Sequence, residues 1–251
     1  MHAEALTQLA RAQALQSKFE AAHRTLDSVA PLLPNLGPRA RIRYSLERGR
    51  VLNSGGAPGR SLPYFLEGWR VARRHGEDAL AVDAAHMVAI VKRGAAQRSW
   101  NLKALKLAEG SRNRRARRWR ASLLNNIGWS QFDSGAYGDA LRSFQRALRY
   151  RQQQTDATET RIARWCVAKA LRLMGRTSEA LLMQRRLLED WRRANSKDGF
   201  VFEELGECLL SLERSREARQ YFRLAYAELS KDSWLIAHEP KRLKRLQRLV
   251  G

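Results

Sequence analysis

Carboxylates are scarce in this sequence. Its 251 residues include 25 Asp and Glu against 47 Lys and Arg, which gives a net charge of +22. Such an excess attracts polyanions, so nucleic acid, an anionic surface or an acidic protein segment are candidate partners. A coding bias toward Arg would explain Arg in place of Lys, but it explains the shortage of carboxylates less well.

Cysteine is almost absent, and Cys166 and Cys208 lie in separate helical patterns. Neither belongs to a C-x-x-C pair, which argues against a disulfide framework, a zinc site or a redox site. Long apolar runs are also lacking. The longest, residues 79–91, is interrupted by Asp83 and His86 and is shorter than the roughly 20 residues that a membrane span needs. No signal peptide is visible at the start, so we expect a cytoplasmic protein without membrane insertion.

Catalytic motifs are missing as well. The sequence contains no H-E-x-x-H, no G-x-S-x-G and no phosphate-binding G-x-x-x-x-G-K-[ST]. No histidine pairs with another His or Cys at ligand spacing. The one acidic cluster on a predicted helix is Glu203, Glu204 and Glu207, in which Glu203 and Glu207 are spaced i, i+4. The sequence therefore predicts no enzyme, no metal and no cofactor.

What the sequence does contain is an internal repeat, clearest over residues 124–148. This segment reads as a helix, a tight turn at Gly135 and a second helix. Gly128 would let the second helix approach the first closely. Ala140, Phe144 and Ala147 are spaced i, i+4 and i+7, so they form one apolar stripe on the second helix.

The segment resembles the tetratricopeptide repeat, which has a small residue in helix A, a Gly turn and Ala-x-x-x-Phe-x-x-Ala in helix B. The position of Ala140 recurs at Ala22, Ser61, Trp100, Ala180 and Ala218, with gaps of 39, 39, 40, 40 and 38 residues along the chain. The helix A position falls on Ala10, Gly49, Val88, Gly128, Ala168 and Gly206, and the Phe position on Leu26, Phe65, Ala104, Phe144, Gln184 and Phe222. The turn position falls on Ser17, Gly56, Ala95, Gly135, Gly175 and Arg214. The third unit matches least well, and a generic helical hairpin is the alternative there.

The resemblance implies an all-α fold, a right-handed superhelical solenoid of about six tetratricopeptide-like helix-turn-helix repeats with a C-terminal capping helix. Such repeats must stack, because one hairpin cannot bury its own apolar stripe. We expect a single solenoid over 1–251, with repeats near 3–34, 39–75, 77–110, 117–152, 158–194 and 198–231 and a cap helix at 239–250. The prolines between 53 and 63 predict a lengthened turn inside the second repeat.

In tetratricopeptide proteins the A helices line a concave face that binds ligands. Carried over by position, this implies a non-catalytic scaffold that binds a peptide or acidic segment of a partner protein. The implied groove residues are Arg50, Lys92, Arg93, Asn125, Trp129, Phe132, Trp165, Lys169, Arg172, Glu203 and Glu207. Lys and Arg can bind a carboxylate, and Trp offers a flat apolar anchor. The alternative for Trp129 and Trp165 is packing between adjacent A helices.

A second candidate surface is the Arg-rich segment 112–120. It contains Arg112, Arg114, Arg115, Arg117, Arg118 and Arg120. Such a cluster can bind phosphates without reading sequence, so the alternative function is binding of RNA or DNA. A solvated edge between repeats is the simpler interpretation of the same residues. The sequence leaves self-assembly into a homo-oligomer open.

Overall fold

The computed structural model describes residues 2–250, and every regular element among them is a helix. The first elements are α1 (His2–Leu15), α2 (Phe19–Val29), the 3₁₀ helix η1 (Ala30–Asn35), α3 (Pro38–Ser54), α4 (Pro58–Arg74), α5 (Asp78–Val91), α6 (Gly94–Gly110) and α7 (Arg114–Arg118). They are followed by α8 (Arg120–Asp133), α9 (Tyr137–Gln153), α10 (Ala157–Leu173), α11 (Thr177–Arg193), α12 (Gly199–Ser211), α13 (Ser215–Leu229), α14 (Ser233–His238) and α15 (Pro240–Val250). The predicted all-α fold class is confirmed.

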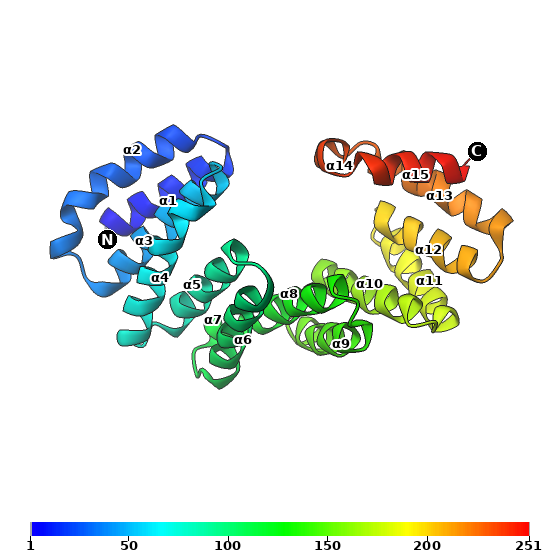
Figure 1. The fold of residues 1–251 in the computed structure, drawn as a ribbon, viewed down its shortest axis with the longest axis horizontal. Helices are drawn as coiled ribbons and strands as arrows, with labels where there is room; N and C mark the ends of the chain where they lie inside the picture. Colours follow the sequence, from blue (N-terminus) through cyan, green and yellow to red (C-terminus); the bar gives the residue numbers. More distant parts are fainter. Residues whose placement is uncertain (1, 251) are drawn as a thin grey trace. The chain divides into compact units, whose positions relative to one another are not determined.

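Most long helices pack in consecutive pairs joined by short turns (Figure 1). The A and B helices of the pairs are α1 and α2, α3 and α4, α5 and α6, α8 and α9, α10 and α11, and α12 and α13. The chain divides into two compact units, Met1–Ile127 and Gly128–Gly251, with the boundary inside α8. The single solenoid over 1–251, its repeat limits and its right-handed superhelix stay predictions.

A glycine on helix A lies against a phenylalanine ring on helix B in three pairs. A Cβ atom added to Gly49, Gly128 or Gly206 would lie 2.5, 2.4 or 2.6 Å from a ring carbon of Phe65, Phe144 or Phe222, respectively. The other pairs have Ala10 with Leu26, Val88 with Ala104 and Ala168 with Gln184 at the equivalent positions, all of them buried. A larger residue on helix A is therefore matched by a smaller one on helix B, as close packing requires. This explains how the third pair accommodates Val88.

The turns within the pairs use the left-handed backbone region. Positive φ occurs at the predicted positions Ser17, Gly56, Gly135 and Gly175. In the third and sixth pairs the predicted Ala95 and Arg214 are wrong by one residue, because Gly94 and Glu213 have the positive φ, at 57° and 61°. A glycine adopts this conformation without cost, whereas Glu213 does so against its Cβ.

The lengthened turn expected between residues 53 and 63 is shorter than predicted. Helix α3 continues to Ser54 and α4 begins at Pro58. Pro58 occupies the first turn of α4, where a missing N–H leaves no hydrogen bond unmade. Pro58 therefore marks the start of a helix and not an extended loop, and Pro63 lies inside that helix.

The C-terminal helix α15 covers the end of the last pair. Its Leu246 is fully buried, and the helix packs mainly on α13. Arg242 donates to Glu203 of α12 from Nε at 3.0 Å, and Arg245 pairs with Glu207. Helix α15 thus covers part of α13 and engages Glu203 and Glu207 of α12.

Candidate functional site

The charged residues predicted to line a groove in the first unit are partly used to join successive A helices. Arg50 of α3 donates to Glu47 at 2.5 Å and pairs with Asp83 of α5. Arg11 of α1 pairs with Glu47 at 3.3 Å. Burial raises the pKa of Glu47, while Arg50 and Arg11 oppose that rise. Burial alone would lower the pKa of Arg50, but Asp83 and Glu47 raise it overall.

The same arrangement recurs in the second unit. The carboxylate of Glu204 on α12 is 1% exposed and accepts from Arg172 Nε at 2.5 Å and from Lys169 Nζ at 3.4 Å, both on α10. Glu203 and Glu207 pair with the arginines of α15 described above. A charged group held this way has little capacity left for an outside carboxylate. The predicted groove residues with such internal ion pairs are Arg50, Lys169, Arg172, Glu203 and Glu207.

The remaining polar candidates of the groove lie in the first unit. Lys92 is half-buried at the end of α5, and Arg93 is exposed just before α6. Asn125 is half-buried on α8. These three side chains therefore come from the end of α5, the start of α6 and α8.

Aromatic side chains form a continuous row along the A helices of the second unit. The Trp129 and Trp165 rings lie 5.9 Å apart between centroids, and the Trp165 and Phe200 rings lie 6.0 Å apart. Phe132 packs on Trp129 at 5.1 Å. The Trp165 indole N–H donates to the Phe200 carbonyl at 3.0 Å, which fixes the orientation of that ring. All four rings remain half-buried, so packing between A helices does not fully cover them.

A pocket of about 560 Å³ opens beside this row. It is lined by Trp129, Ile162, Trp165, Cys166, Trp191, Lys197, Asp198, Gly199, Phe200, Glu228, Leu229 and Asp232. Its size and mainly apolar, aromatic walls are typical of a ligand site. The structure thus brings Trp129 and Trp165 together with Ile162, Trp191 and Phe200, which the sequence analysis had not selected.

The charged residues at the rim of this aromatic pocket have structural partners. Asp198 accepts from the backbone N–H groups of Phe200 and Val201 at 2.9 and 3.3 Å and so caps α12. Burial raises the pKa of Asp198, and these hydrogen bonds oppose the rise. Glu228 pairs with Lys231 at 3.1 Å and Lys197 at 3.9 Å. The pocket can therefore accept an apolar or aromatic side chain, with little free charge at its own walls.

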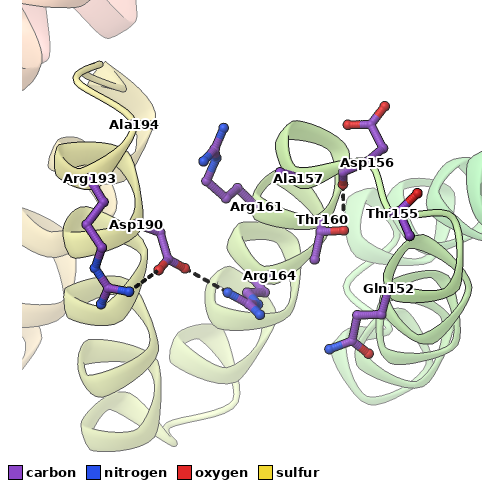
Figure 2. A pocket seen from close by; sticks show the side chains of 10 residues that line it. All are labelled: Gln152, Thr155, Asp156, Ala157, Thr160, Arg161, Arg164, Asp190, Arg193 and Ala194. Atoms are coloured by element: carbon purple, nitrogen blue, oxygen red, sulfur yellow. Dashed lines mark hydrogen bonds and ion pairs between the residues drawn. The ribbon is translucent and has the colours of Figure 1, made fainter.

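A second, polar pocket of about 570 Å³ lies between α9, α10 and α11 (Figure 2). Asp190 accepts from Arg164 at 2.7 Å and pairs with Arg193 at 3.8 Å. Arg161 extends from α10 and places its guanidinium 4.1 Å from the centre of the Trp191 ring, a cation–π contact. Since Trp191 lines the aromatic pocket and Arg161 the polar one, the two pockets share a wall.

The Arg-rich segment forms the short helix α7 and its flanks. The Asn113 side chain caps α7 by accepting from the backbone N–H of Arg115 at 2.8 Å. Ala116 is buried, and the Trp119 ring packs 5.1 Å from the His86 ring of α5. Arg112, Arg114, Arg115 and Arg118 are exposed, while Arg117 and Arg120 are half-buried.

Groups suited to chemistry are few in the part of the chain that the structure describes. No cluster of three or more His, Cys, Asp or Glu residues that could hold a metal lies among residues 2–250. In the same range, no helix is long and apolar enough to cross a membrane. Burial raises the pKa of both Cys166 and Cys208 to about 12, so neither is an activated nucleophile.

The sequence matches no protein-family model and no curated protein. Solved structures do match. RapI in its apo form aligns with 91% of this chain and 65% of its own, at a TM-score of 0.75 and 11% identity. A signal-transduction ATPase with a tetratricopeptide repeat sensor, from Pyrococcus horikoshii, aligns with 97% of this chain and 38% of its own, at 0.78 and 14% identity. NprR in complex with its cognate peptide NprX aligns with 97% of this chain and 70% of its own, at 0.60 and 18% identity.

These likenesses define the fold as a tetratricopeptide-like helical repeat, which confirms the resemblance found in the sequence. The chain spans less than two thirds of the length of RapI and of the ATPase. The fold alone does not carry a function from those proteins to this one.

Proposed function

We propose that the protein is a non-catalytic interaction scaffold that binds a peptide segment of a partner protein in the aromatic pocket of its second unit. The observation that carries this proposal is the row of Trp129, Trp165 and Phe200 beside a pocket of about 560 Å³. Trp is among the residues most enriched at the positions that dominate binding energy in protein interfaces. NprR, which shares the fold, was solved with a bound peptide.

The shape of the site favours a particular kind of segment. An apolar or aromatic side chain of the peptide would occupy the pocket between Trp165, Trp191 and Ile162. Acidic residues next to it would lie toward Arg161, which lines the polar pocket and forms no ion pair among residues 2–250, whereas Arg164 and Arg193 are paired with Asp190. This keeps the acidic partner expected from the sequence, but its cationic contact becomes Arg161 in place of the predicted Lys169 and Arg172.

The ion pairs of Glu203 and Glu207, the candidate acid–base pair, support a binding role without catalysis. Glu203 and Glu207 are the paired carboxylates that the sequence offered for such work. Both are held by arginines of α15. A carboxylate already engaged by a guanidinium is not free to contact a substrate.

The test is selection of peptides from a random library displayed on phage, followed by calorimetry with a synthetic copy of the strongest binder. We expect selected sequences to share a large apolar residue flanked by Asp or Glu. Ile162→Arg places a charge in the pocket at a side chain that is 43% exposed, so the core is spared. Affinity should fall at least about tenfold, since one buried apolar anchor contributes roughly 1.5–3 kcal/mol.

The matched control is Leu224→Arg on α13, a side chain 44% exposed and outside the pocket. It should bind the same peptide as the wild type does. Equal affinity of Ile162→Arg and wild type for every selected peptide would show that the aromatic pocket is not the binding site.

A further inference from the structure

Nearly half of the basic excess is concentrated in one segment of the first unit. Residues 84–127 contain eleven Lys and Arg and a single carboxylate, Glu109, a net charge of +10 out of +22 for the whole chain. The cations are Lys92, Arg93, Arg98, Lys103, Lys106, Arg112, Arg114, Arg115, Arg117, Arg118 and Arg120. A general preference for Arg over Lys would not remove the carboxylates from this one segment.

These cations differ from those of the A helices in their ion pairing with carboxylates. Arg50, Lys169 and Arg172 are paired with buried or half-buried carboxylates, as described above. With Arg118 and Arg120 set aside, the other nine cations of the segment form no ion pair with a carboxylate of residues 2–250. Their charge is therefore not neutralised by the fold and is available to an outside anion.

The elements that bear these cations are neighbours. Helix α7 packs against both α5 and α6, and α5 packs against α6. Arg98 and Lys106 lie on one stripe of α6, eight residues apart, and both are exposed, as is Lys103. Arg112, Arg114 and Arg115 are exposed on α7 and the link before it. The cationic surface thus extends over two packed helices and does not end at a single turn.

We propose that this surface binds the phosphate backbone of a nucleic acid. Six of the nine cations without an ion pair are Arg, whose planar guanidinium binds phosphate through two hydrogen bonds. An extended array of unpaired cations matches an extended array of phosphates, and binding releases condensed counterions. The surface lies in the first unit and the aromatic pocket in the second, so this proposal is independent of peptide binding.

The experiment measures fluorescence anisotropy of a labelled oligouridine of about 30 nucleotides, long enough to cross several cationic elements, at a series of salt concentrations. The variant carries Arg112→Glu, Arg114→Glu and Arg115→Glu. The matched control carries Arg216→Glu, Arg219→Glu and Arg223→Glu on α13, three exposed arginines that form no ion pair among residues 2–250. Both variants undergo the same change in net charge.

The α7 variant should bind at least about tenfold more weakly, and the slope of log K against log salt should fall by about 2, since three contacts to a single strand are lost. The control should change affinity by less than about threefold and keep the wild-type slope. Ile162→Arg should bind the oligonucleotide as the wild type does.

Three outcomes would overturn the proposal. The first is equal weakening by the two triple variants, because affinity would then follow net charge alone. The second is no salt-dependent binding by the wild type. The third is displacement of the oligonucleotide by polyglutamate or by phosphatidylserine vesicles at equal charge concentration, which would assign the surface to an acidic protein or a membrane.

Discussion

The contact between Gly206 and Phe222 makes the match of residue sizes between paired helices directly testable. Gly206 lies inside α12, and a Cβ there would meet the Phe222 ring at 2.6 Å. Phe222 is 1% exposed, so its ring has no solvent to move into. Gly206→Ala should therefore strain the pair, although the same change in an open helix stabilises it.

The magnitude follows from two opposing terms. Overpacking a filled core costs about 1–3 kcal/mol. Replacing glycine by alanine in a helix contributes about 1 kcal/mol in the other direction. Gly206→Ala alone should lower the free energy of unfolding by about 0–2 kcal/mol, and Phe222→Leu alone by about 1–2 kcal/mol through the space that it leaves.

The double variant, Gly206→Ala with Phe222→Leu, has the same combination of alanine and leucine as Ala10 and Leu26 of the first helix pair. Because the smaller leucine side chain leaves room for the new methyl group, the double variant should be at least as stable as Phe222→Leu alone. The interaction energy of the cycle should therefore be about 1–3 kcal/mol in favour of the double variant. The assay is urea unfolding followed by circular dichroism, with Gly59→Ala as control, since a Cβ at Gly59 would meet nothing within 4 Å. Effects that add to within about 0.5 kcal/mol would refute the size-matching argument.

Three further changes test other features. Glu213→Gly relieves a φ of 61° and should raise the free energy of unfolding by about 1 kcal/mol, seen as a higher urea midpoint; an unchanged midpoint would argue against strain there. Burial, with a smaller effect of a nearby guanidinium, lowers the pKa of His86 in the folded protein. The unfolded chain therefore binds a proton more readily, so the free energy of unfolding has its full value above pH 6.5 and decreases as the pH falls through the folded pKa. His86→Gln should flatten that loss in unfolding curves, and His75→Gln, at an exposed ring, should not. Because burial raises the pKa of Cys166 and Cys208 to about 12, against an ordinary 9.0, iodoacetamide should modify both about 1000-fold more slowly than a free thiol until urea unfolds the chain; rapid labelling of the folded protein would contradict this.

Sequence spacing was sufficient for the helix pairs but not for the contacts between them. The markers recur every 38–40 residues, and the buried Ala22, Ala140, Ala180 and Ala218 show that these positions are equivalent. Trp100 departs from the pattern because it packs on Trp69 of α4, with ring centres 5.5 Å apart. The one-residue errors at Ala95 and Arg214 arose because a fixed offset was applied where the turns shift to Gly94 and Glu213.

The candidate site was predicted only in part, and its contacts show why. Trp129, Trp165 and Phe200 are 36 and 35 residues apart, and Arg50 and Asp83 are 33 apart. Contacts along successive A helices therefore fall about one helical turn short of the repeat period, because neighbouring helices are staggered. Reading only equivalent positions missed Phe200, whereas spacing near 35 would have found it. Trp191 was missed because it lies on a B helix, whereas the groove residues were selected on A helices alone.

The joints between successive A helices also differ chemically from one place to the next. Arg11 meets Glu47 at one joint, Arg50 meets Asp83 at the next, Trp129 meets Trp165 further on, and Lys169 and Arg172 meet Glu204 after that. Leaving a buried carboxylate such as that of Glu204 without its cation is strongly destabilising. The helix pairs of this protein are consequently not interchangeable. Deleting, duplicating or reordering one pair would place a charged side chain against an aromatic ring, or one acidic side chain against another. The order of the pairs is therefore fixed by side chains that a consensus sequence of the repeat does not contain.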